Sequence, residues 1–145
     1  MEGEKKKILI VDDDNFLLDM YALKFSQNNF EVYTAQSGLQ AIEKIKGGFS
    51  PDVLLMDIIM PEMDGFEILE KINADKLSPN SVKIILSNKS QQEDIDRGNS
   101  LGVAGYIAKA NSTPAEVISQ VIDILSKKVA PDGKSGPRSE SIGAK

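Results

Sequence analysis

Two short apolar runs decide the fold, Ile8-Leu9-Ile10-Val11 followed by Asp12-Asp13, and Val53-Leu54-Leu55-Met56 followed by Asp57. Runs that are apolar throughout are typical of strands buried on both faces, as in a parallel sheet. In an open α/β sheet, ligands bind beyond the carboxyl ends of the strands. The two runs therefore predict a parallel sheet with three carboxylates close together at one edge.

Neighbouring carboxylates repel one another, and without compensation the pKa of at least one of them rises. A divalent cation removes this conflict, and Mg²⁺ prefers oxygen ligands and keeps part of its water shell. Asp12, Asp13 and Asp57 therefore indicate a Mg²⁺ site and chemistry at phosphorus. Each acid also has a plainer explanation, because Asp12 or Asp13 could cap the following helix and Asp57 could be an ordinary loop acid.

The rest of the chain alternates between strand-like and helix-like periodicity. The expected strands cover residues 7–11, 31–34, 53–57, 83–87 and 103–108. The expected helices cover residues 15–27, 37–46, 65–73 and 91–100, with a last helix after Thr113. Because crossovers between parallel strands are right-handed, this alternation predicts a doubly wound, flavodoxin-like α/β domain. It has a five-stranded parallel sheet in the order 2-1-3-4-5 with helices on both faces.

Further signals indicate where helices begin and which side they bury. Ser37 with Gln40, and Thr113 with Glu116, match the capping-box pattern at two helix starts. Helical spacing predicts an amphipathic first helix and a buried stripe on the last helix. The residues at this spacing are Phe16, Leu17, Met20, Leu23 and Lys24 in the first helix, and Ile118, Val121, Ile122 and Leu125 in the last.

The overall composition is that of an ordinary globular protein. The 145 residues are 41% apolar and 27% charged, which suits one domain with a substantial core. The formal net charge of -5 argues against direct nucleic-acid binding, and Lys5-Lys6-Lys7 is too short to reverse it. No apolar run approaches the roughly 20 residues of a membrane helix. With no cysteine and no secretory signal in residues 1–7, we expect a cytoplasmic protein.

Two further features limit the chemistry and the domain organisation. The chain contains no histidine, which excludes a histidine general base, a histidine metal ligand and a phosphohistidine of its own. After Val129 the apolar periodicity stops abruptly. We therefore expect one domain over residues 1–129 and a disordered tail, linker or added segment over residues 130–145.

Polar residues end four of the expected strands, and their combination is far more specific than any one of them. Alone, Ser87 would be a turn or cap residue and Lys109 a solvated charge. The motifs are Ile10-Val11-Asp12-Asp13, Leu55-Met56-Asp57-Ile58-Ile59-Met60-Pro61-Glu62-Met63-Asp64-Gly65, Leu86-Ser87 and Tyr106-Ile107-Ala108-Lys109. On these motifs, residues 6–128 resemble a response-regulator receiver domain of the single-domain, chemotaxis-regulator type.

The resemblance implies that Asp57 accepts a phosphoryl group from a partner's phosphohistidine. It also implies that Asp13, Asp57 and the carbonyl of Ile59 coordinate Mg²⁺ directly, while Asp12 holds a metal-bound water. Such a transfer needs positioning of the carboxylate and electrostatic stabilisation of the phosphoryl oxygens, which a cation supplies.

For the switch, the resemblance implies that Lys109 pairs with Asp57 and then with a phosphoryl oxygen. Ser87 would hydrogen-bond another phosphoryl oxygen, and Tyr106 would swing inward with it. Without these neighbouring motifs, an aromatic residue in a strand is more often a packing residue.

Two positions differ from the common form of the family. Ala110 follows Lys109, where a cis-proline is usual, and a cis non-proline bond costs about 2.5–4 kcal/mol. We therefore expect a trans bond with a remodelled loop or a strained cis bond. Asn88 follows Ser87, where a small residue is common, and we hypothesise that it alters the lifetime of the phosphorylated state.

Two other functions remain open. Asp12-x-Asp14, the segment 83–88 and Lys109 also resemble haloacid-dehalogenase-type phosphatases, in which Asp12 would be the nucleophile. That interpretation leaves Asp57 and its Met-Pro loop unexplained. The other alternative is a phosphate-independent receiver-like interaction module, against which the complete set of acids argues.

We therefore expect a phosphorylation-controlled switch in a two-component or phosphorelay pathway that catalyses its own phosphorylation and dephosphorylation. The expected partners are a histidine kinase or histidine phosphotransfer protein and a downstream effector protein. No output domain is expected after Val129, and the domain would be a monomer or a phosphorylation-dependent dimer. The resemblance places the communicating face on the fourth helix, fifth strand and last helix, which carry Asp94, Asp96, Arg97, Tyr106 and Lys127.

Overall fold

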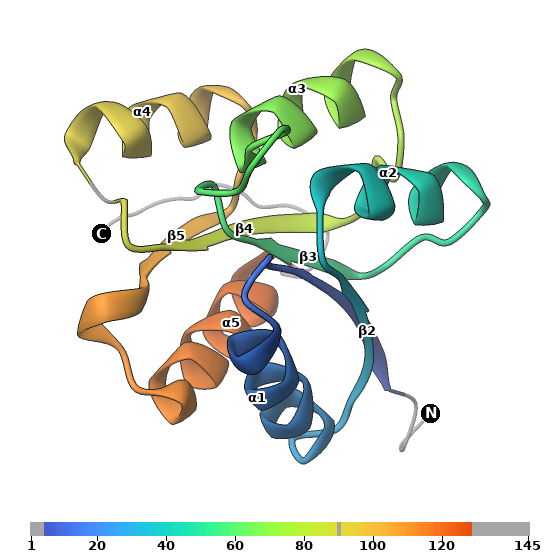
Figure 1. Cartoon of the computed structure of the whole chain (residues 1–145). Helices are drawn as coiled ribbons and strands as arrows, with labels where there is room; N and C mark the ends of the chain where they lie inside the picture. The colour runs from blue at the N-terminus through green and yellow to red at the C-terminus, as the bar shows by residue number, and fades with distance from the viewer. Residues whose placement is uncertain (1–4, 90, 129–145) are drawn as a thin grey trace.

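The computed structural model describes residues 5–89 and 91–128, which form a parallel sheet between two layers of helices (Figure 1). The strands are β1 (Lys6–Val11), β2 (Phe30–Ala35), β3 (Val53–Met56), β4 (Val82–Ser87) and β5 (Gly105–Ala108), in the order β2-β1-β3-β4-β5. The helices are α1 (Asn15–Ser26), α2 (Gly38–Lys46), α3 (Gly65–Ala74), α4 (Gln92–Ser100) and α5 (Pro114–Lys128), with a 3-10 turn over Lys109–Asn111. The predicted fold class and strand order are confirmed.

The two central strands are buried on both faces because their side chains alternate between two cores. Ile8 and Ile10 of β1 pack in the core under α1 and α5, whereas Leu9 and Val11 pack under α2 and α3. Figure 1 shows α1 and α5 on one face of the sheet and α2, α3 and α4 on the other. Burying a large aliphatic side chain stabilises the fold by about 1.5–3 kcal/mol, so these strands anchor the sheet.

The register of the strands brings their carboxyl ends to one level. Val11 of β1 pairs with Met56 of β3, and the N–H of Asp57 donates to the carbonyl of Val11 at 3.0 Å. Ser87, the last residue of β4, pairs with Ala108, the last residue of β5. The polar residues at or just after these strand ends therefore meet at one edge of the sheet.

The side of α1 that faces the core differs from the predicted one. Leu18, Tyr21 and Phe25 are buried, whereas Phe16 is 77% exposed and Leu23 is 57% exposed. Two more residues of the predicted set are half-buried against the core, Leu17 and Met20. The expected apolar set therefore contacts the core at Leu17 and Met20 but not at Phe16 and Leu23, because α1 is apolar on two sides and spacing alone does not identify the buried one.

The predicted stripe of α5 is correct except at one position. Ile118, Val121 and Leu125 are buried in the core under α1 and α5, as predicted. Ile122 is 45% exposed, and the prediction that it is buried was wrong. It lies one residue beyond Val121 on the turn, and a step of one residue rotates a side chain by about 100° around the helix.

The N-terminal caps of α2 and α5 use the residues that the sequence predicts. The N–H of Gln40 donates to Ser37 Oγ at 3.1 Å, but the Gln40 side chain accepts from Gln36, so only half of that capping box forms. Thr113 and Glu116 form the complete reciprocal pair, at 2.8 and 3.2 Å. These contacts satisfy backbone groups that would otherwise lack partners at the helix starts.

In the part of the chain that the structure describes, no helix is long and apolar enough to cross a membrane. The segment predicted to be a tail, residues 130–145, lies outside the described residues.

Candidate functional site

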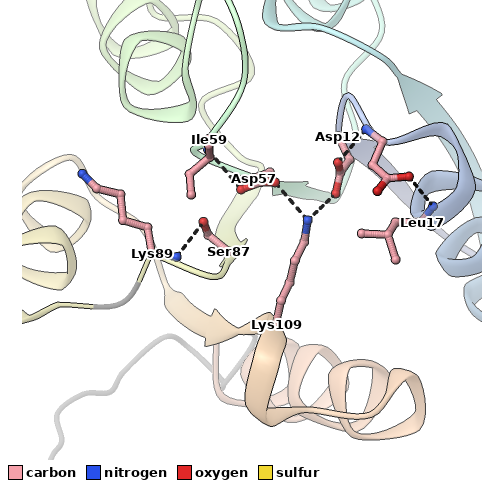
Figure 2. Close-up of polar contacts among 8 residues, drawn as sticks. Asp12, Leu17, Asp57, Ile59, Ser87, Lys89 and Lys109 are labelled. Atoms are coloured by element: carbon pink, nitrogen blue, oxygen red, sulfur yellow. Dashed lines mark hydrogen bonds and ion pairs between the residues drawn. The ribbon is translucent and has the colours of Figure 1, made fainter.

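The carboxyl edge of the sheet gathers two buried carboxylates around one lysine. Lys109 Nζ donates to Asp12 Oδ2 at 2.7 Å and to Asp57 Oδ2 at 2.9 Å. The side chains are 9% exposed for Lys109, 4% for Asp12 and 9% for Asp57. Figure 2 shows the lysine entering from the end of β5 and reaching both carboxylates. The residues predicted from three strand ends are thus brought into direct contact.

The second oxygen of each carboxylate is held by the backbone of the following loop. Asp12 Oδ1 accepts from the N–H of Asp14 at 2.9 Å, and Asp57 Oδ1 accepts from the N–H of Ile59 at 3.0 Å. Both contacts span two residues, the spacing of an Asx turn. The two carboxylates therefore have a fixed orientation.

Asp13 completes a group that can hold a cation. One carboxylate oxygen from each of Asp12, Asp13 and Asp57 lies within 4.8 Å of those of the others, and Asp13 is exposed. An all-oxygen set, open to water on one side, matches the preference of Mg²⁺. Asp12 and Asp13 do not cap α1, because Asp14 does so, accepting from the N–H of Leu17 at 3.2 Å.

The charges of the site are only partly balanced. Burial raises the pKa of the Asp12 carboxyl above its ordinary value, and the hydrogen bond from Lys109 opposes this only in part. Burial alone would lower the pKa of the Lys109 ammonium, but its hydrogen bonds to Asp12 and Asp57 outweigh burial and raise it. Lys109 therefore stays charged, and the three carboxylates retain an excess of negative charge.

Ser87 and Tyr106 lie on the neighbouring strands and meet at the β4–α4 loop. Ser87 is fully buried, and its Oγ accepts from the N–H of Lys89 at 3.2 Å (Figure 2). The hydroxyl of Tyr106 donates to the carbonyl of Lys89. Burial, followed by the charges of Asp94 and Asp57, raises the pKa of Tyr106 to about 12. One loop residue thus contacts both of the predicted switch residues.

The loop after β3 is shaped by close backbone packing. A Cβ on Gly65 would lie 2.6 Å from the carbonyl oxygen of Asp57 and 2.8 Å from Ile58 Cα, so only glycine fits. Asp64 and Glu67 form a capping box at the start of α3, with both bonds at 2.9 Å. This tight turn places α3 directly against Asp57.

A model of the response regulator receiver domain matches residues 8–131 of the chain. The chain belongs to this family. Among curated relatives, it is 31% identical over 120 residues to the alkaline phosphatase synthesis transcriptional regulatory protein PhoP of Bacillus subtilis, covering 83% of this chain and 48% of PhoP. It is 30% identical over 120 residues to the response regulator SaeR of Staphylococcus aureus, covering 83% of this chain and 50% of SaeR. The chain spans about half the length of these curated relatives.

Solved structures of receiver domains share the architecture. The CheY-like receiver domain protein of Methanospirillum hungatei JF-1 superimposes with a TM-score of 0.76 at 29% identity, covering 86% of this chain and 96% of that one. The receiver domain of the putative response regulator NarL from Mycobacterium tuberculosis gives a TM-score of 0.74 at 26% identity, covering 85% and 98%.

Three features of this receiver domain were not predicted from the sequence or were left open. Lys109 was expected to pair with Asp57, and the structure adds a bond to Asp12 that is shorter, at 2.7 Å compared with 2.9 Å. The peptide bond between Lys109 and Ala110 is trans, and a 3-10 turn begins there, which decides between the two expected forms. Asp94, placed by sequence on the communicating face, is buried and pairs with Lys89 at 3.2 Å. The sequence signal for a capping role of Asp94 was its position three residues after Gln91, the N-cap of α4.

Proposed function

We propose that this receiver domain is a phosphorylation-controlled switch that accepts a phosphoryl group on Asp57. The donor is the phosphohistidine of a histidine kinase or of a histidine phosphotransfer protein. The observation that supports this best is the geometry of Lys109, whose ammonium bonds both Asp12 and Asp57 while one oxygen of Asp57 stays held by the loop.

In the transfer, an oxygen of Asp57 forms a bond to phosphorus as the bond from phosphorus to the donor's histidine nitrogen breaks, and that nitrogen keeps the electron pair. Charge spreads over the three equatorial oxygens of the phosphoryl group. The Lys109 ammonium, 2.9 Å from Asp57, is placed to stabilise one of these oxygens. Ser87 can donate its hydroxyl proton to another, because its contact with Lys89 uses only an acceptor site.

The acidic group fits Mg²⁺ by its donors and its charge. Asp12, Asp13 and Asp57 offer oxygen ligands only, and three carboxylates face one ammonium, that of Lys109, which bonds two of them. We propose that Asp13, Asp57 and the carbonyl of Ile59 would hold the ion directly, with Asp12 acting through a water. When bound, Mg²⁺ supplies positive charge to the phosphoryl oxygens and to the carboxylates.

The product carries about -1.5 to -2 charges and new acceptor oxygens. We propose that Ser87 and Tyr106 respond to it and that the signal passes to an effector protein by binding, in the cytoplasm. The domain acts as a monomer or as a phosphorylation-dependent dimer. The same chemistry lets it catalyse its own phosphorylation and dephosphorylation.

The test is intact-mass measurement after incubation with acetyl phosphate, with and without Mg²⁺. The wild type should gain one phosphoryl group, and both EDTA and Asp57→Asn should abolish the gain. Asp75→Asn, which removes an exposed carboxylate at the C-cap of α3 that pairs with Lys71, is the matched control and should behave as the wild type.

Two outcomes would contradict the proposal. A mass gain that persists in Asp57→Asn but disappears in Asp12→Asn would favour the phosphatase alternative with Asp12 as nucleophile. No gain on the wild type under any condition would favour the phosphate-independent interaction module.

A further inference from the structure

Lys89 joins three parts of the molecule through three different groups. Its N–H donates to Ser87 Oγ at 3.2 Å, its carbonyl accepts from the hydroxyl of Tyr106, and its ammonium lies 3.2 Å from Asp94 Oδ1. These partners belong to β4, β5 and α4. Figure 2 shows the Lys89 ammonium directed away from Asp57, whereas the backbone nitrogen of the same residue faces Ser87.

Asp94 is a buried carboxylate in the first turn of α4. Its side chain is 6% exposed, compared with 50% for its partner Lys89. Its Oδ2 accepts from the N–H of Gln91 at 3.3 Å, so both carboxylate oxygens have a partner. Burying a carboxylate is costly unless it is paired, and removing one partner of a buried pair leaves that cost uncompensated. The ammonium of Lys89 therefore pairs with a buried carboxylate of α4, and this pair is costlier to break than an ion pair between two exposed side chains.

The ring of Tyr106 lies between α4 and the loop that contains Lys89. On one side it approaches Gly98, where an added Cβ would lie 3.6 Å from Tyr106 Cδ2. On the other side its hydroxyl bonds the carbonyl of Lys89. The position of that carbonyl depends on the loop, and the loop is tied to α4 by the side chain of the same residue.

We propose that the Lys89–Asp94 ion pair is a latch that holds Lys89 against α4 and thereby fixes Tyr106, with Asp94 as a positioning residue. Its use in signalling rests on the proposed function, in which Ser87 meets the phosphoryl group. A shift of Ser87 moves the N–H of Lys89, and the latch passes this movement to Tyr106 and to α4 together. Without the latch, the loop moves independently of the helix.

The latch is measurable in the unphosphorylated protein by 19F NMR with 3-fluorotyrosine. The chain has three tyrosines, and Tyr106→Phe assigns the resonance of interest. Lys89→Met and Asp94→Asn should each move the Tyr106 resonance toward that of an exposed tyrosine. We expect the ratio of held to released Tyr106 to fall at least about fivefold.

Two variants separate the latch from a general loss of charge. Lys71→Met breaks the Lys71–Asp75 pair of 3.4 Å on the surface of α3 and should leave the Tyr106 resonance unchanged. Lys89→Arg keeps the ion pair and should keep Tyr106 held. If Asp94→Asn does not fold, Lys89→Met still tests the latch, because half of that side chain is exposed.

The phenol titration of Lys89→Met gives opposite signs for the two explanations. Loss of a positive charge would by itself raise the pKa of Tyr106, whereas release from its half-buried position lowers it from about 12. A raised pKa, an unchanged resonance in both variants, or an equal change in Lys71→Met would overturn the latch. A failure of Asp57 to take up phosphate would overturn the proposed function instead, since these measurements use no phosphodonor.

Discussion

Replacing Lys109 with methionine tests the charge balance of the site most directly. The substitution keeps the length of the side chain and removes the ammonium that bonds Asp12 and Asp57 at 2.7 and 2.9 Å. One oxygen from each of the three acids lies within 4.8 Å of those of the others, and two unit charges at that distance repel by about 3.5 kcal/mol at an effective dielectric constant near 20. Breaking a buried pair by removing one partner costs about 3–5 kcal/mol.

We therefore expect Lys109→Met to lose about 3 kcal/mol of unfolding free energy at pH 7.5 without Mg²⁺, or about 6–12 °C in Tm. The control, Lys127→Met, breaks an exposed pair with Asp123 and should cost less than about 0.5 kcal/mol. Urea and thermal unfolding, followed by circular dichroism, measure both.

The pH dependence of the variant has a definite sign. Burial already raises the pKa of the Asp12 carboxyl, and loss of the Lys109 ammonium removes the hydrogen bond that opposes this, so in the variant that pKa rises further and the folded state binds a proton more readily. The destabilisation is then largest above that folded-state value and shrinks as the pH falls toward the unfolded value. In the wild type, the raised pKa of Lys109 stabilises the fold below 10.5, and this contribution is lost as the pH rises through the folded-state value.

Mg²⁺ provides a second check on the same substitution. Because the ion replaces the missing positive charge, it should stabilise Lys109→Met more than the wild type. A variant as stable as Lys127→Met, or a loss that is the same at pH 5 and pH 7.5, would refute the assignment of Lys109 as the counter-charge of both carboxylates.

Five further substitutions test other parts of the structure. Gly65→Ala should lose more than about 2 kcal/mol in urea unfolding, because the new Cβ meets backbone atoms at 2.6 and 2.8 Å. Gly105→Ala should cost less, since its Cβ meets the movable end of the Ile124 side chain and no backbone atom. Leu23→Ser should change stability by less than about 0.5 kcal/mol, whereas Phe25→Ala should lose about 3–5 kcal/mol, a difference that denaturant midpoints measure. Asn88→Ala should alter the decay rate of the acyl phosphate followed by mass, and unchanged phosphorylation and decay rates would reject that hypothesis.

The sheet could be predicted from the sequence because each of its buried strands is a continuous apolar run, which can be recognised without knowing what packs against it. A strand buried on both faces is apolar at every position, as in Ile8–Val11 and Val53–Met56, and needs no choice of side. The polar residue that ends each run lies at the edge of the sheet for the same reason. Parallel topology therefore places Asp12 and Asp57 at one edge of the sheet, whereas the pairing of Lys109 with Asp57 was expected only from the family resemblance.

A helix requires the further choice of which side is buried, and α1 shows where that choice fails. Phe16 and Leu23 have the spacing of a buried stripe, but Leu18 and Phe25 form another on the same helix. Only the packing of the helix on the sheet selects between them. The pairing of Lys89 with Asp94 was equally beyond sequence reasoning, because it depends on how a loop folds back on the following helix.

The central strands also explain how the fold tolerates a site that opposes folding. The raised pKa of Asp12 means that its ionised form is less favourable in the folded protein than in the unfolded chain. The adjoining residues of β1 and β3 are 0–1% exposed, and each large side chain contributes about 1.5–3 kcal/mol by burial. That contribution is large enough to hold three carboxylates against one ammonium. The remaining two negative charges equal the charge of one divalent cation in magnitude, so the charge imbalance among these residues favours the ion that the proposed phosphoryl transfer needs.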